Sequence, residues 1–195
     1  MKDMNGGSII LMGIKHCGKS TQGKLIASKL DLAFYDTDDV IAALTGKSAR
    51  DIFSGQGEAA FKDAEICACR HVAGIVKEDG GRAVIATGGG ICNNAPALEV
   101  LRPLGAFVFL IAPEQVAADR ILKEARTRPD GTPENLPAYI AKKNPRSMDE
   151  ARRMFHEFYE ERTRLYAGIA DCSVRMENDS KQANADRIIS FINRS

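Results

Sequence analysis

The chain has 195 residues, 44% of them hydrophobic, so it can bury a core of its own without disulfide staples. Its 27 lysines and arginines nearly balance its 26 aspartates and glutamates, which leaves no overall electrostatic attraction to nucleic acid or to an anionic membrane. The apolar run at 106–112 is too short to span a bilayer, and residues 1–8 carry no apolar signal region. We therefore expect a cytosolic protein.

The first part of the chain alternates strand-like and helix-like segments. A short apolar run at 8–13 predicts a strand, and apolar residues at helical spacing predict a helix at 18–30. A brief second strand follows at 33–35, then a helix at 38–46 that ends at a glycine, a usual helix stop. Residues 57–78 predict a long amphipathic helix.

The rest of the chain continues this alternation. A third strand at 82–90 runs into a glycine turn, and 95–103 predicts a short helix. The run 106–112 predicts a fourth, fully buried strand, and Pro113 opens a helix at 113–125. A final strand and helix are predicted at 171–176 and 181–192. Buried strands separated by helices imply an α/β fold, in which helices cover both sides of a parallel sheet.

One segment breaks the alternation. Residues 126–147 hold four of the chain's seven prolines and are rich in charge. A connection of this length in a compact domain is usually a lid, a binding loop or a disordered linker, and a tolerated surface insertion is the alternative. The arginines that flank the segment favour the lid.

The five cysteines do not suggest a disulfide framework, because their number is odd and their spacing is unpaired. Cys67, Cys69 and His71 occupy every second position of the predicted helix 57–78. Since helical positions two apart do not face each other, ordinary helix residues are favoured there over a metal site.

The segment 13–20, GIKHCGKS, matches the P-loop pattern, with a strand predicted before it and a helix after it. Its glycines allow backbone N–H groups to point at phosphate oxygens, and the helix adds its positive dipole end. Lys19 would place a cation on the β- and γ-phosphates, and Ser20 would offer a hydroxyl to Mg²⁺. The expected ATP site comprises Gly13, Ile14, Lys15, His16, Cys17, Gly18, Lys19, Ser20 and Thr21.

Two aspartates follow the second predicted strand. Asp36 and Asp38 would project from its carboxyl end, which is the edge where open α/β sheets bind ligands. They could simply cap and charge a helix N-terminus. Beside a P-loop, one of them can support Mg²⁺, and the other can orient an attacking hydroxyl and accept its proton.

Three consecutive glycines, Gly88, Gly89 and Gly90, end the third predicted strand. A turn alone needs one or two glycines, and each costs backbone entropy. Close approach of this backbone to a ligand explains the third glycine better than a turn does.

These motifs together resemble those of the shikimate kinase family, in order and over nearly the whole chain. They are the P-loop, FYDTDDVI (34–41), GKSARDIFSGQGEAAFKDAE (46–65), VIATGGGI (84–91), ARTRP (125–129) and ERTRLY (161–166). The P-loop alone is unspecific, but its combination with Asp-x-Asp, GE..F and the triple glycine is specific among P-loop kinases.

The resemblance implies a single P-loop kinase domain over 1–195, three-layered α/β/α, with a five-stranded parallel sheet of order 2-3-1-4-5. It implies a substrate-binding region at about 38–78 and a mobile lid at about 120–147. It implies transfer of the γ-phosphate of ATP to the 3-hydroxyl of shikimate, with Mg²⁺ as cofactor, in aromatic amino-acid (chorismate) biosynthesis. The expected partner is this small molecule alone, bound by a monomer.

The resemblance also implies roles for individual residues. Asp36 and Ser20 would support Mg²⁺, and Asp38 would bind the acceptor hydroxyls and act as base. Arg162 would bind the acceptor carboxylate. Arg128 would reach the transferring phosphate, and Arg120 would lie against adenine, while Gly88, Gly89 and Gly90 would line the acceptor pocket.

Two departures from the family pattern keep alternatives open. Lys62 stands where the family has an arginine that grips the acceptor carboxylate, so a point charge replaces a bidentate fork. After Pro129 the lid continues with Asp130-Gly131-Thr132 in place of a leucine pair. The alternatives are a related kinase for another hydroxy acid or sugar acid, and a nucleotide-binding regulator without catalysis.

Overall fold

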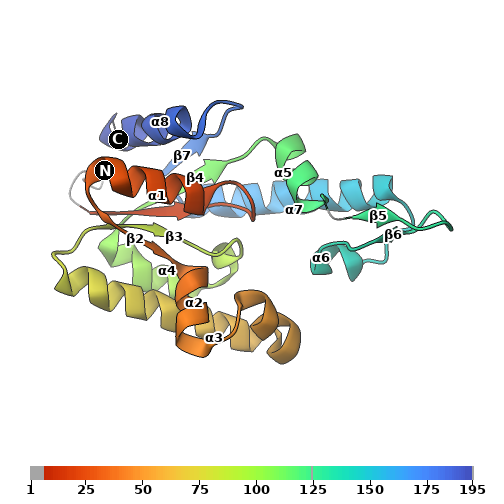
Figure 1. The fold of residues 1–195 in the computed structure, drawn as a ribbon, viewed down its shortest axis with the longest axis horizontal. Helices are drawn as coiled ribbons and strands as arrows, with labels where there is room; N and C mark the ends of the chain where they lie inside the picture. Colours follow the sequence, from red (N-terminus) through yellow and green to blue (C-terminus); the bar gives the residue numbers. More distant parts are fainter. Residues whose placement is uncertain (1–6, 124, 195) are drawn as a thin grey trace.

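The computed structural model describes residues 7–123 and 125–194, and its centre is a five-stranded parallel sheet (Figure 1). The strands lie in the order β2 (Ala33–Asp36), β3 (Ala83–Ala86), β1 (Ser8–Met12), β4 (Gly105–Ile111) and β7 (Cys172–Arg175). This confirms the expected order 2-3-1-4-5, since β7 is the fifth strand of the sheet. The inner strands form the core because every residue of β1 and β3 is buried.

Helices cover both faces of the sheet. The helices α1 (Lys19–Leu30) and α8 (Lys181–Arg194) lie together over one face, and α3 (Ala49–Glu78) and α4 (Ala95–Leu101) lie over the other (Figure 1). The remaining connections are α2 (Thr37–Thr45), α5 (Glu114–Ile121) and the short 3₁₀ helices η1 (Ile91–Asn93) and η2 (Arg102–Leu104). The predicted helices at 18–30, 38–46, 95–103 and 181–192 are thus confirmed, with small shifts of their ends. The helix predicted at 113–125 is present but ends at Ile121, and residue 124 of the predicted range lies outside the described residues.

Two helices differ from the sequence-based expectation. The helix α3 begins at Ala49, eight residues before the predicted start, because Ser48 caps it, and Gly57 then interrupts it with φ 89° and ψ 178°. The helix α7 (Met148–Ile169) was not predicted at all. Ser147 caps it, and its Tyr166 ring stacks on Phe109 of β4 with the centroids 5.2 Å apart.

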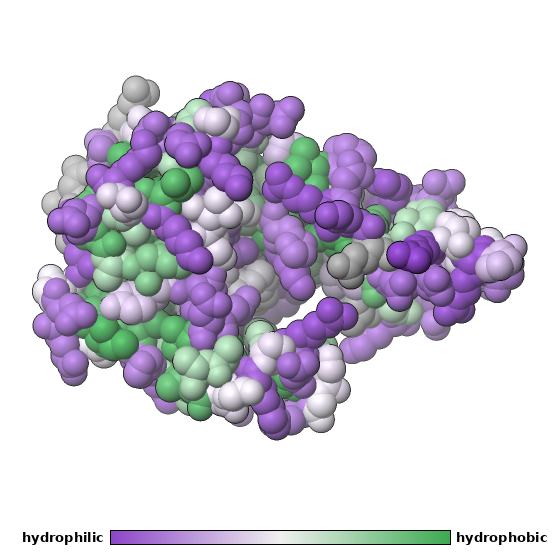
Figure 2. All heavy atoms as spheres, viewed as in Figure 1, coloured by the Kyte–Doolittle hydropathy of each residue, from purple (hydrophilic) through white to green (hydrophobic). Residues whose placement is uncertain are grey.

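The proline-rich segment 126–147 projects from the sheet (Figure 1). It forms an antiparallel pair, β5 (Arg126–Thr127) with β6 (Pro133–Glu134), and the short helix α6 (Ala138–Ala141). Figure 2 shows a hollow with a hydrophilic rim between this projection and the body of the molecule. This segment therefore stands apart from the alternating strands and helices, and its role as a lid stays a prediction.

Candidate active site

The P-loop connects β1 to α1, as expected from its sequence. Gly13 and Gly18 have φ values of 148° and 105°, which lie in the region that favours glycine. Lys19 is 8% exposed, and its Nζ donates to the carbonyls of Gly13 at 2.9 Å and Ile14 at 3.0 Å. The loop therefore holds the ammonium group over its own backbone, at the position where phosphate oxygens bind in such loops.

Ser20 and Asp36 meet beside this loop. The Ser20 hydroxyl donates to Asp36 Oδ2 at 2.5 Å, and Asp36 Oδ1 accepts from the backbone N–H of Asp38 at 3.0 Å. Asp36 therefore caps α2, as one interpretation of this aspartate predicted, and it also contacts Ser20 at the start of α1. A hydroxyl and a carboxylate oxygen side by side suit Mg²⁺, a hard cation that prefers oxygen ligands.

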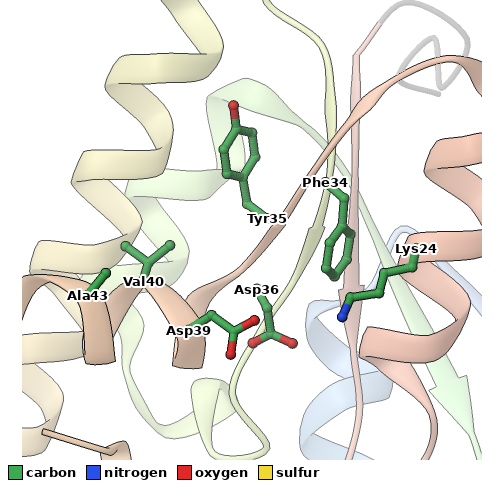
Figure 3. Close-up of a pocket in the computed structure, with 7 residues that line it drawn as sticks. All are labelled: Lys24, Phe34, Tyr35, Asp36, Asp39, Val40 and Ala43. Carbon is green, nitrogen blue, oxygen red and sulfur yellow. The ribbon is translucent and has the colours of Figure 1, made fainter.

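A cavity of about 300 Å³ opens at the edge strand β2 (Figure 3). It is lined by Lys24, Phe34, Tyr35, Asp36, Asp39, Val40 and Ala43. Asp36 therefore contacts Ser20 on one side and lines this cavity on the other. A carboxylate that supports Mg²⁺ through water requires such access, because Mg²⁺ usually keeps several of its waters.

The glycine turn after β3 contacts the P-loop on one side and Asp38 on the other. A β-carbon at Gly89 would lie 2.8 Å from the backbone nitrogen of Lys15, and one at Gly88 would lie 3.0 Å from Asp38 Oδ1. Backbone atoms therefore exclude a side chain at Gly89, and two carboxylate side chains crowd Gly88, whereas a β-carbon at Gly90 would meet nothing within 4 Å. The expectation that close approach of a ligand explains the third glycine stays a prediction.

Asp38 lies at the start of α2 with its carboxylate next to this turn. Partial burial raises the pKa of Asp38, and the charge of Asp36 raises it further, against the opposing charges of Lys19 and Lys15. A raised pKa makes the carboxylate a better proton acceptor.

Glu65 is a buried member of the site that the sequence analysis did not single out. The side chain is 0% exposed, and its Oε2 accepts from Asn94 Nδ2 at 2.9 Å. Oε1 has no hydrogen-bond partner among the described residues and lies 2.9 Å from the place of a β-carbon on Gly88. Burial raises the pKa of Glu65 to about 7; Asn94 and Lys62 oppose this shift, and the charge of Asp38 adds to it.

A sequence signal for Glu65 existed. Its position continues the buried stripe of α3, which runs through Ala68, Cys69 and Val72. An acidic residue on an apolar helix stripe is rarely buried unless it has a partner or a function.

Arg162 comes from α7, the helix that was not predicted. Its Nη1 donates to Cys92 Sγ at 3.0 Å, and its guanidinium lies 5.1 Å from the centre of the Phe158 ring. Its Nε is buried and has no hydrogen-bond partner in the described part of the chain. A buried cationic donor without a partner fits a site for an anionic ligand group.

The side chain of Lys62 is held in an ion pair within its own helix. Its Nζ pairs with Glu58 Oε1 at 2.9 Å, one helical turn back along α3. Lys62 lowers the pKa of Glu58, and the charges of Lys142 and Arg162 add to this effect. Lys62 and Arg162, the two cations expected to bind the acceptor carboxylate, thus already interact with the carboxylate of Glu58.

The two remaining arginines differ in position. Arg120 of α5 donates through Nη1 to the carbonyl of His16 at 3.0 Å, so it lies against the P-loop. Arg128 instead pairs with Glu134 across the β5–β6 ladder at 3.1 Å, on the projecting segment. The structure thus brings Arg120 to the nucleotide site but leaves Arg128 on the lid, because the hairpin holds its guanidinium locally.

This fold and this edge of the sheet define a P-loop kinase that acts on a small molecule. The family model for shikimate kinase matches residues 15–193. The chain is 31% identical to the shikimate kinase of Syntrophus aciditrophicus, over 93% of this chain and 89% of that one, and 31% identical to that of Aquifex aeolicus, over 94% and 95%. The chain belongs to the shikimate kinase family.

Solved structures agree with this assignment. Shikimate kinase from Acinetobacter baumannii in complex with shikimate superposes with a TM-score of 0.73 at 25% identity, covering 97% of this chain and 94% of that one. A gluconokinase from Sinorhizobium meliloti, 16% identical with a TM-score of 0.56, shares the fold alone. Among the described residues, no helix is both long enough and apolar enough to cross a membrane.

Proposed function

We propose that this chain transfers the γ-phosphate of ATP to the 3-hydroxyl of shikimate and so makes shikimate 3-phosphate for aromatic amino-acid (chorismate) biosynthesis. The contacts of the glycine turn carry the proposal, because Gly89 lies against the P-loop and the adjacent Gly88 lies against Asp38. An acceptor hydroxyl at Asp38 would therefore face the phosphates held by the loop. Family membership supports shikimate as the acceptor.

The residues divide the work between donor and acceptor. Lys19 would neutralise charge that develops on the transferring phosphoryl group, and Asp38 would hold the acceptor hydroxyl in line and take its proton. Arg162 would bind the acceptor carboxylate through its unpaired Nε. Mg²⁺, held by Ser20 and through water by Asp36, would shield the phosphate oxygens.

The projecting segment would complete the site when it closes. Residues at about 120–147 would act as the lid of a single domain, with the substrate-binding region at about 38–78. Closure would bring Arg128 from its pairing with Glu134 to the transferring phosphate and would exclude water. We expect the enzyme to work as a monomer in the cytoplasm, and analytical ultracentrifugation of the purified chain tests the first of these expectations.

A coupled assay of ADP release with shikimate, quinate and gluconate tests the proposal. We expect turnover with shikimate and little or none with the other two. Turnover with gluconate but not with shikimate would favour a related sugar-acid kinase, for which the pairing of Lys62 with Glu58 is the motivating observation. ATP binding without any phosphorylated product would indicate a regulator.

The role of Asp38 has its own test. Asp38→Asn should reduce kcat by a factor on the order of 10² or more while ATP still binds, because the amide cannot accept the proton. Asp79→Asn, an exposed aspartate at the C-terminal end of α3, is the control. Near-normal turnover of Asp38→Asn would exclude Asp38 as the base.

A further inference from the structure

The turn that follows the three glycines holds one edge of the Arg162 guanidinium. Nη1 of Arg162 donates to the sulfur of Cys92 at 3.0 Å. The amide of Asn93 is assigned with its oxygen toward Arg162, because the opposite assignment would place donors face to face. In this orientation it accepts from Nη1 at 3.0 Å and from Nη2 at 2.8 Å. Both residues belong to η1, so this 3₁₀ turn accepts hydrogen bonds from Nη1 and Nη2 of Arg162.

The Nε–H of the guanidinium takes part in neither of these contacts. Nε of Arg162 is buried and unpaired within the described residues, and the ring of Phe158 lies 5.1 Å from the guanidinium carbon. Nε and Nη2 form the edge that binds a carboxylate with two parallel hydrogen bonds. The contacts to Cys92 and Asn93 therefore determine which edge of the Arg162 guanidinium is available to a carboxylate and in which plane the guanidinium lies.

The surroundings of the Cys92 sulfur are polar, unlike those of a cysteine that only fills space. The hydroxyl of Tyr166 is fully buried, and Cys92 is its neighbour. Burial raises the pKa of Tyr166, and the neighbouring Cys92 raises it further, so a neutral phenol lies beside the thiol. Arg162 and Tyr166 are one helical turn apart on α7 and both face this sulfur.

We propose that Cys92 is a positioning residue for the acceptor: by holding Arg162 against η1, it orients indirectly the cation that binds the acceptor carboxylate. The inference rests on the proposed function, since it needs an acceptor with a carboxylate. Arginine has a long side chain that loses rotamer freedom when it binds, so a fixed guanidinium loses less on binding than a free one. With Lys62 paired to Glu58, Arg162 is the cation whose orientation matters most.

Kinetics of Cys92 variants test this role. Cys92→Ala should raise the KM for shikimate roughly three- to tenfold, as expected when a cationic donor loses one weak sulfur acceptor, with kcat and the KM for ATP nearly unchanged. Cys92→Ser should restore most of the affinity, because a hydroxyl also accepts from Nη1. In an Arg162→Lys background, Cys92→Ala should have no further effect on this KM.

The matched control is Cys172→Ala, which removes another half-buried thiol, on the edge strand β7 and outside both η1 and α7. It should leave both KM values unchanged. Circular dichroism melting curves show whether each variant is folded. Equal defects in Cys92→Ala and Cys92→Ser, or an undiminished effect in the Arg162→Lys background, would overturn the proposal in favour of simple packing.

Alkylation of the unmodified enzyme provides a measurement that does not depend on a variant. The Cys92 sulfur displaces iodide from iodoacetamide, and the thiol proton passes to solvent. Saturating shikimate should slow labelling of Cys92, measured by peptide mass spectrometry, and leave labelling of Cys172 unchanged. Equal labelling of Cys92 with and without shikimate would contradict the proposal.

The two levels of inference can fail separately. Wild-type turnover with shikimate is measured first, and its absence would refute the proposed function together with the role of Cys92. Normal wild-type turnover with an unchanged KM in Cys92→Ala would refute the role of Cys92 alone.

Discussion

Glu65 is the residue whose replacement should change the stability of this protein most clearly with pH. Burial raises its pKa from 4.5 to about 7, so the folded protein keeps a proton on this carboxyl that the unfolded chain releases at lower pH. Below about pH 4.5 the carboxyl is protonated in both states and has no effect. As the pH rises from 4.5 to 7 the unfolded state is increasingly favoured, and above 7 the full penalty remains.

The size of the penalty follows from the two pKa values. Each unit of pKa difference corresponds to about 1.36 kcal/mol, so ionised Glu65 should destabilise the fold by about 3 kcal/mol at pH 8. Glu65→Gln keeps the shape of the side chain and an oxygen for Asn94 but cannot ionise. Its free energy of unfolding should therefore exceed that of the wild type increasingly from pH 5 to pH 8.

Urea denaturation of both proteins at several pH values between 5 and 8 measures this difference. The variant-minus-wild-type difference isolates Glu65 from other groups that titrate, such as Asp38. Glu99→Gln, an exposed glutamate on α4, is the control and should show no trend. The reasoning would be refuted if the difference in free energy of unfolding between Glu65→Gln and the wild type stayed constant with pH. It would also be refuted if the wild type became more stable relative to the variant toward pH 8.

Three further predictions concern ligand binding. Lys62→Arg should lower the KM for shikimate at nearly constant kcat, because a planar fork replaces a point charge, and an unchanged or higher KM would remove Lys62 from the acceptor site. Glu58→Gln should also lower this KM by releasing Lys62 from its ion pair, whereas a higher KM would show that Glu58 assists binding. Ser20→Ala should raise the Mg²⁺ concentration needed for half-maximal activity several-fold, measured by magnesium titration at fixed ATP, and an unchanged requirement would place Mg²⁺ elsewhere.

Local spacing in the sequence was sufficient for the P-loop, the strands and most of the helices. The conformation of Gly13 and Gly18, the cap at Asp36 and the end of α2 at Gly46 all depend on residues within a few positions of one another. Such features can be read from the sequence because the same short-range sterics and hydrogen bonds operate in any fold. The order of the sheet came from the family resemblance rather than from these patterns.

The tertiary structure alone decided which side chains meet. Glu65 meets Asn94 across 29 positions, and Arg162 meets Cys92 across 70. These contacts depend on how α3 and α7 pack against the glycine turn, and no local periodicity encodes that packing. Arg128, expected to reach the phosphate from the lid, instead pairs with Glu134 six positions away, and this local contact of the hairpin is not evident from the sequence pattern. The sequence by itself therefore determined the P-loop and the edge of the sheet that holds the site. Packing between distant segments decided the charge state of Glu65 and the orientation of Arg162 in the proposed acceptor site.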